Sequence, residues 1–152
     1  MIIHSFQQRQ RLPISLDEAW GFFSNPQNLP KLTPDWMHLT FKEGIPNDMH
    51  AGMKMTQQLK PLLGIPLTWV TEITHIEEKV YFVDEQRVGP YRFWHHEHCL
   101  HELPSGVEVT DSLHYALPFN IIGEIVHQLL VKKKIADVFE YRYERLEELF
   151  GK

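Results

Sequence analysis

The chain has 152 residues, of which 43% are hydrophobic and 23% charged, a composition typical of a globular protein with one sizeable core. Its net charge of −5 argues against a nucleic-acid-binding protein, because such proteins usually carry a basic excess. The single cysteine, Cys99, excludes an intrachain disulfide, and no stretch approaches the roughly 18 apolar residues of a membrane span. The first residues lack the apolar core of a signal peptide, so we expect a cytoplasmic protein in which residues 1–152 form one domain.

The N-terminal part of the sequence predicts a strand followed by two short helices. Residues 2–12 alternate loosely between apolar and polar types up to Pro13, which is typical of a strand. Ser15 is followed three residues later by Glu18, and this capping box predicts a helix that begins there. A second short helix is expected over Asn28–Leu32, because the prolines around it exclude a longer one.

The central part, from Met37 to Pro118, has an apolar period of two and predicts six more strands. Their expected ranges are 36–43, 52–60, 65–76, 79–88, 91–103 and 107–117. Strands that follow one another through short links form an antiparallel meander rather than parallel crossovers. We therefore expect one antiparallel sheet of seven strands.

The C-terminal part predicts a long amphipathic helix of roughly 30 residues. We expect its apolar stripe to pack on the apolar face of the sheet. The stripe consists of Ile122, Ile125, Val126, Leu129, Ala136, Phe139, Tyr143, Leu146 and Phe150. The predicted fold is thus α+β, with a curved antiparallel sheet around a long helix and room for a cavity between the two layers.

The sequence resembles a known superfamily along almost its whole length. The resemblance lies in "LPISLDEAWGFFSNPQNLPKLTP", "IPLTWVTEI" and "FVDEQRVGPYRFWHHEHCLHELPSGVEVTDSLHYALP". These stretches are similar to START, Bet v 1 and polyketide cyclase proteins, the SRPBCC superfamily, and within it to an uncharacterised bacterial branch of cyclase/dehydrase-like ligand-binding proteins. Cys99 and Leu100 depart from that pattern, where a basic residue and a phenylalanine are more usual. The resemblance implies the helix-grip fold.

The functions that the resemblance implies fall into three classes. The one we favour is a protein that binds a hydrophobic or lipid-like small molecule between the sheet and the C-terminal helix, without a cofactor. The second is an enzyme of the cyclase or dehydratase type. The third is an interaction module, because similar segments also occur fused to epimerase-like domains, which makes a dehydrogenase- or epimerase-like protein a candidate partner.

The densest group of chemically active side chains is "WHHEHCLH", residues 94–101. Alternate residues of a strand share a face, so this stretch divides into two sets of four. The first set is Trp94, His96, His98 and Leu100, and the second is His95, Glu97, Cys99 and His101. The family resemblance implies that the first set points inward.

The hairpin that follows decides which of these residues lies beside Asp111. A loop of two or four residues at "LPSG" places His98 opposite Asp111, whereas a three-residue loop with a bulge at Gly106 places Cys99 there. The sequence is compatible with both loops. We adopt the register in which His96, His98 and Asp111 share the inward face.

Three interpretations of that inward group remain open. His98 and Asp111 are a purely structural pair that satisfies two buried polar groups, or the group lines a cavity and orients the polar end of a ligand. The third interpretation, a zinc site, requires all three side chains to converge, and we expect no metal. In an enzyme, His98 would be the acid–base group and Asp111 the residue that orients it.

The remaining candidates for the wall of the cavity follow from the same alternation of faces. Aromatic planes shape a pocket, while the polar members of each face anchor a ligand. The full set of predicted ligand-binding residues is Trp69, Asp84, Gln86, Trp94, His96, His98, Asp111 and Tyr115.

Overall fold

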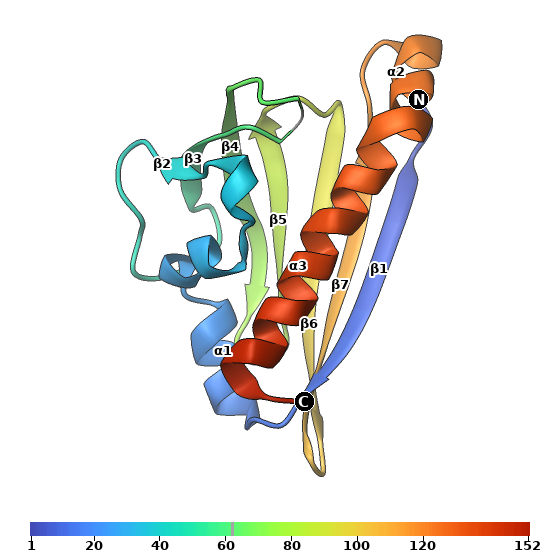
Figure 1. Cartoon of the computed structure of the whole chain (residues 1–152). Coiled ribbons are helices and arrows are strands. Elements are labelled where there is room, and N and C mark those ends of the chain that lie inside the picture. The colour runs from blue at the N-terminus through green and yellow to red at the C-terminus, as the bar shows by residue number, and fades with distance from the viewer. Residues whose placement is uncertain (62) are drawn as a thin grey trace.

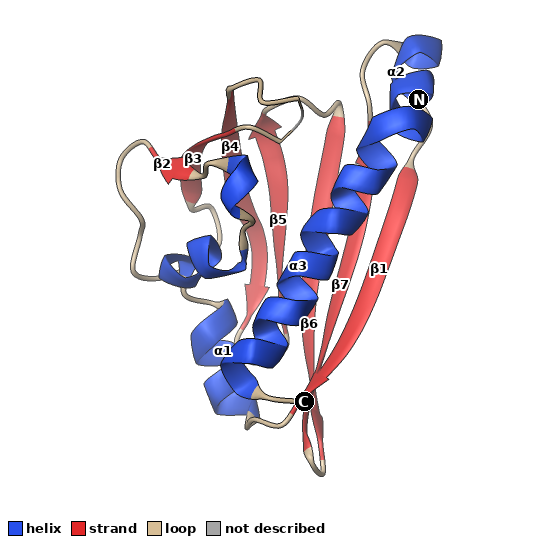
Figure 2. Cartoon of the chain, viewed as in Figure 1, coloured by secondary structure: helices blue, strands red, loops and turns tan. Residues whose placement is uncertain are grey.

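The computed structural model of the protein describes residues 1–61 and 63–152. It contains a seven-stranded antiparallel sheet with the strand order β1–β7–β6–β5–β4–β3–β2. The helices lie on one face of this sheet, as Figures 1 and 2 show. The strands are β1 (His4–Leu12), β2 (Thr40–Phe41), β3 (Lys54–Leu59), β4 (Leu67–Glu77), β5 (Tyr81–Val88), β6 (Phe93–Leu103) and β7 (Gly106–Ala116). The helices are α1 (Leu16–Phe23), α2 (Asn120–Val126) and α3 (Lys132–Phe150).

This arrangement confirms the predicted α+β helix-grip fold. The sheet curves around α3, which runs along its concave face, while α1 lies beside the C-terminal end of α3 and contacts β6 and β7 (Figure 1). None of the helices in the described ranges is both long and apolar enough to cross a membrane.

Helix α3 is held on the sheet by one buried stripe and by two side chains of the edge strand. Its buried residues are Ile135, Phe139, Arg142 and Leu146, so an arginine occupies one position of an otherwise apolar stripe. On β1, the amide nitrogens of Gln8 and Gln10 donate to backbone carbonyl oxygens of α3, at 3.1 and 2.9 Å. These contacts fix the position of the helix relative to the floor of the sheet.

The first third of the predicted C-terminal stripe does not pack on the sheet, so that part of the prediction is wrong. Ile122, Ile125 and Leu129 are 68%, 54% and 79% exposed, and α2 extends past the ends of the strands in Figure 1. A π-helical turn over His127–Val131 separates α2 from α3. Such a turn contains one residue more than an α-helical turn, so it rotates the apolar face between the two helices.

Other residues of the predicted stripe also differ from the expectation. Ala136 is exposed and Val126 is 40% exposed, while Tyr143 and Phe150 are only partly buried. Val131 is fully buried and was not part of the predicted stripe.

The segment between β1 and β3 contains one confirmed helix start and one wrong strand. Ser15 caps α1, since its hydroxyl oxygen accepts a bond from the backbone N–H of Glu18 at 3.1 Å. The second short helix is a 3₁₀ helix over Pro26–Leu32. The strand predicted over 36–43 is reduced to β2, because residues 35–37 form another 3₁₀ helix that ends at His38 in the left-handed conformation (φ 50°).

The hairpin between β6 and β7 has the register adopted from the sequence. Leu103 pairs with Gly106 across a two-residue turn, and His98 lies opposite Asp111. Gly106 has a φ of 153°, and a Cβ atom at this position would lie 2.1 Å from the backbone oxygen of Leu12. A side chain is therefore excluded from the residue that sets the register.

Candidate functional site

A pocket of about 230 Å³ lies between the sheet, the 22–39 segment and one side of α3. Apolar and aromatic side chains form most of its wall, and the polar groups come from strands β3 to β6 and from α3. The apolar part includes Met55, Leu59, Trp69, Phe82, Trp94 and Phe139, and the polar part includes Gln57, Thr71, Asp84, His96, His98 and Arg142.

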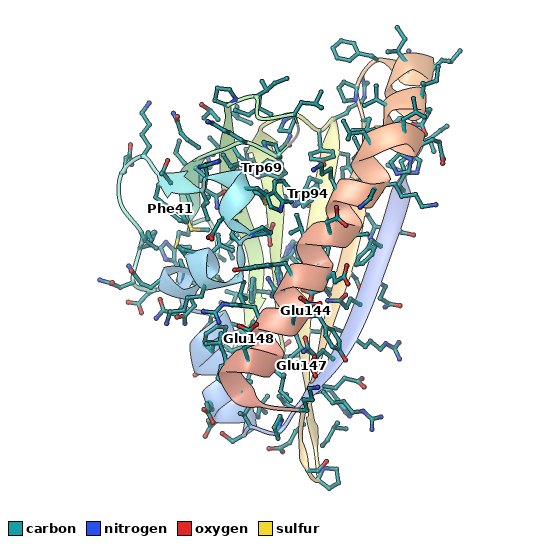
Figure 3. All side chains as sticks on the ribbon, in the orientation of Figure 1. Phe41, Trp69, Trp94, Glu144, Glu147 and Glu148 are labelled. Carbon is teal, nitrogen blue, oxygen red and sulfur yellow. The ribbon has the colours of Figure 1, made fainter. Side chains whose placement is uncertain are left out.

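Three aromatic side chains form one end of the pocket. The rings of Trp69 and Trp94 meet edge to face, with centroids 5.0 Å apart and an interplanar angle of 88°. Figure 3 shows them side by side between the sheet and the helix. Tyr91 packs against both rings at centroid distances of 5.6 and 4.7 Å. Because this cluster is mostly apolar, it is suited to contact the hydrocarbon part of a ligand.

The polar end of the pocket is a group of charged side chains on three adjacent strands. Asp84 Oδ2 on β5 lies 2.5 Å from His98 Nε2 and 3.8 Å from His96 Nδ1, both on β6. Asp111 Oδ1 on β7 lies 3.0 Å from His96 Nε2 and 3.3 Å from His98 Nδ1. Each imidazole thus stands between the same two carboxylates.

Arg142 of α3 completes this polar group from the opposite layer. Its Nε lies 3.5 Å from Asp111 Oδ2, and the whole residue is only 8% exposed. This Nε makes no hydrogen bond within the described residues. The guanidinium also faces the ring of Phe23 at 5.6 Å. A buried arginine beside a carboxylate pair supplies one of the positive charges that such a pair requires.

The electrostatics of the group follow from burial and from these contacts. Burial acts to raise the pKa of Asp111, but the charge of Arg142 and the bonds from the histidines outweigh it and hold that pKa well below its usual value. Burial also acts to raise the pKa of Asp84, but the bond with His98 and the charges of the two histidines together outweigh burial and lower this pKa. Both carboxyl groups are therefore ionised at neutral pH.

The pKa values of the two histidines shift in opposite directions. For His96, burial and the charge of His98 lower the pKa. For His98, burial also acts to lower the pKa, but the interactions with Asp111 and Asp84 outweigh burial and raise this pKa. With His98 protonated, the positive charges of His98 and Arg142 balance the two carboxylates, which lowers the cost of burying them.

Within residues 1–61 and 63–152, two groups of side chains have donor atoms close enough to hold a metal ion. In the pocket they are Asp84, His96 and His98, whose ligand atoms all lie within 4.8 Å of one another. The second group, with the same spacing, is His4, Glu124 and His127, near the junction of β1 and α2. Of the two, only the first contributes to the wall of the pocket.

The structure places six of the eight predicted site residues together. Trp69, Asp84, Trp94, His96 and His98 line the pocket, and Asp111 lies directly behind the two histidines. The other two, Gln86 and Tyr115, do not line the pocket, and each makes a hydrogen bond elsewhere.

Gln86 and Tyr115 are the two predicted site residues outside the pocket wall. The amide of Gln86 bonds to the backbone of Tyr91, donating to its oxygen at 2.7 Å and accepting from its nitrogen at 3.0 Å. The hydroxyl of Tyr115 lies 2.7 Å from His127 Nε2. Alternation along a strand identifies the face of a side chain but not the neighbour that it meets, which explains both differences.

Arg142 was not identified from the sequence, although a signal for it was present. It lies seven residues after Ile135 and four residues before Leu146, so it occupies a position of the buried helical stripe. A charged residue at such a position is rarely buried without a partner, and this points to a buried acidic group. Gln57 and Thr71, joined by a buried bond of 2.9 Å, lie on strand faces that the alternation assigns to the wall, but they were not in the predicted ligand-binding set.

Comparisons with known proteins show the fold. None of the family models and none of the curated proteins that were compared matches this sequence. Among solved structures, TTHA0849 from Thermus thermophilus is 16% identical over 95% of each chain, with a TM-score of 0.72. CV1439 from Chromobacterium violaceum is 10% identical over 97% of each chain, also with a TM-score of 0.72.

An allergen of the Bet v 1 type has the same architecture. Ara h 8.0201 is 15% identical to this chain, over 97% of this chain and 99% of the other, with a TM-score of 0.64. At these identities the likeness concerns the backbone and not the site. The chain therefore has a Bet v 1-like, helix-grip fold.

Proposed function

We propose that this protein binds a small, mainly apolar molecule in the pocket between the sheet and α3. The observation that carries the proposal is the division of the pocket wall, with an aromatic end around Trp69 and Trp94 and a charged end around Asp84 and His98. Binding sites for small molecules are usually concave and apolar, with a few polar groups that fix the orientation of the ligand. The ligand is expected to have an oxygen-bearing group at one end.

The size of the pocket limits the class of ligand. Its volume of about 230 Å³ is slightly below the roughly 300–1,000 Å³ that is usual for small-molecule sites. This favours one ring system or one medium-length chain over a lipid with two acyl chains. The flexible side chains of Met37, Met49 and Met55 line the pocket and can adapt to ligands of different shape.

The orientation of the histidines favours binding over acid–base catalysis. Nε2 of His98 contacts Asp84 at 2.5 Å, and Nδ1 faces Asp111 at 3.3 Å, so each ring nitrogen of His98 already faces a carboxylate. A general acid or base needs a nitrogen within reach of the substrate. His98 has none in this arrangement, and we therefore do not propose the cyclase or dehydratase reaction.

Native mass spectrometry of the purified protein, followed by denaturation and identification of what is released, tests this function. We expect an organic adduct of small mass that is lost on denaturation. If the isolated protein carries no adduct, medium-chain fatty acids or alcohols are added, and we expect one of them to bind. Failure of both the native adduct and the added compounds to bind would contradict the proposal.

A further inference from the structure

We propose that Asp84, His96 and His98 bind one divalent transition-metal ion at the polar end of the pocket. Their donor atoms converge from adjacent strands: His98 Nε2 and His96 Nδ1 lie 2.5 and 3.8 Å from the same oxygen of Asp84. All three ligand atoms lie within 4.8 Å of one another. Two imidazoles and one carboxylate form a ligand set that suits zinc or iron(II).

Asp111 has the position of a carboxylate that orients metal-bound histidines. Its Oδ1 lies 3.0 Å from His96 Nε2 and 3.3 Å from His98 Nδ1. These are the two ring nitrogens that do not face Asp84. Histidine ligands almost always donate their second N–H to such a group, which leaves the lone pair of the other nitrogen for the metal. Asp111 is hydrogen-bonded to His96 Nε2 in this way, while His98 Nδ1 lies beside the same oxygen and makes no hydrogen bond within the described residues.

A metal ion bound here would take the place of the proton between His98 Nε2 and Asp84. When both imidazoles are neutral and carry their protons on His96 Nε2 and His98 Nδ1, the lone pairs of His96 Nδ1 and His98 Nε2 face the carboxylate of Asp84. Three electron-rich atoms in a buried site repel unless a proton or a cation lies between them. Because bonds to zinc are about 2.0–2.2 Å long, donor atoms around one ion are separated by about 3–3.5 Å, between the two observed separations.

Asp84 is the ligand that can move to bring the three donor atoms to the separations that a metal ion requires. Its side chain is 17% exposed, more than those of His96 and His98 at 9% each, and it lies at the pocket wall. A rotation of this carboxylate changes its distances to both imidazoles. The two imidazoles, with centroids 3.7 Å apart and held by Asp111, are the fixed part of the site.

The charges indicate what completes the coordination. With neutral imidazoles, an ion of charge +2 and Arg142 exceed the two carboxylates by one positive charge. Three protein ligands leave a coordination position open, and this position faces the pocket. An anionic or carbonyl oxygen of a pocket ligand would fill it, so a bound ion would add an electrophilic centre to the proposed binding site.

Titration of metal-free protein with cobalt(II) and zinc(II) tests the site without any organic ligand. The visible absorption of cobalt(II) reports its ligands, and calorimetry gives the stoichiometry and Kd for zinc(II). Both should be measured in a His4→Gln background, because His4, Glu124 and His127 form the second group with metal-binding spacing. We expect one equivalent to bind, with an absorption spectrum of low coordination number.

Matched variants separate this site from adventitious binding. Asp84→Asn and His98→Asn should weaken zinc binding at least a hundredfold, and Asp111→Asn should weaken it about 10- to 100-fold as an orienting residue. His95→Gln, on the opposite face of β6, should bind as the parent does. Circular dichroism identifies any variant that does not fold.

A further measurement needs no variant. In crystals of the unmodified protein grown with zinc, anomalous diffraction should place the ion between Asp84, His96 and His98. An ion peak only at other residues, or calorimetry with no binding at micromolar concentrations, would overturn the inference. Either result leaves the binding of an apolar molecule in the pocket untouched, because that binding is measured separately on the released compound.

Discussion

Asp111 Oδ1 on β7 lies 3.0 Å from His96 Nε2 on the neighbouring strand β6, and both residues are buried, at 3% and 7% exposed. This contact joins the pocket wall on β6 to the neighbouring strand β7. The same carboxylate faces Arg142 of α3 at 3.5 Å through its other oxygen. Asp111 therefore links the sheet, the pocket and the helix.

Replacement of Asp111 by alanine should destabilise the fold strongly. Without this carboxylate, Arg142 and His98 are left buried beside an incomplete set of partners, and breaking a buried ion pair costs about 3–5 kcal/mol. The control is Asp137→Ala, which removes an exposed pair with Lys133 and should cost less than about 0.5 kcal/mol. Urea unfolding of both variants measures the difference, and equal losses would contradict the account.

Two leucines of the C-terminal helical segment should respond differently to the same truncation. Leu146 is 1% exposed and packs in the core, so Leu146→Ala should lower the free energy of unfolding by about 2–5 kcal/mol. Leu129 is 79% exposed, so Leu129→Ala should change it by less than about 0.5 kcal/mol. A large loss in Leu129→Ala would show that the apolar face of this segment is packed after all.

The stability of the protein should fall in alkaline solution, partly through Tyr91. This residue is 8% exposed, and burial raises the pKa of its phenol well above the ordinary value. Above pH of about 10 the unfolded chain loses this proton while the folded chain keeps it, so the free energy of unfolding decreases as the pH rises.

Tyr91→Phe isolates this contribution. Urea unfolding between about pH 9 and about pH 11 should show a shallower decrease for the variant than for the parent protein. A decrease of equal slope in both proteins would mean that Tyr91 ionises as readily in the fold as in the unfolded chain.

Filling the mouth of the pocket should block binding and leave the fold intact. Val138 on α3 lines the pocket and is partly buried, so Val138→Trp places an indole in the space of the ligand. Ala136→Trp on the same helix is the control, because Ala136 is exposed and does not line the pocket. Calorimetric titration with a medium-chain fatty acid should show at least a tenfold loss of affinity in the first variant only.

Most of the fold was predictable because its strands alternate and its links are short. The register of the hairpin was not settled by the sequence, since both loop lengths suit "LPSG", and the approach of Leu12 to Gly106 became visible only in three dimensions. The phase of the C-terminal helix was also missed, because the π turn at His127 has no periodic signature. When the helical spacing is continued through that turn without a break, it places Ile122 and Leu129 on the buried face, although both are exposed.

The candidate site was only partly predictable for a related reason. Strand alternation brought Asp84, His96, His98 and Asp111 to one face. However, the expected pairing was His98 with Asp111 alone, whereas the structure has both histidines between the two aspartates. Arg142 comes from a different layer, 31 residues from Asp111 along the chain, and its partner depends on how α3 packs.

The most direct test of the proposed binding site is the indole N–H spectrum of the four tryptophans, recorded by nuclear magnetic resonance during titration with a medium-chain fatty acid. Trp69 and Trp94 line the pocket, whereas Trp20 does not. The account predicts large, saturable shifts of the Trp69 and Trp94 signals and little change at Trp20, with the shifts abolished in Val138→Trp. Unchanged Trp69 and Trp94 signals at saturating ligand would contradict it.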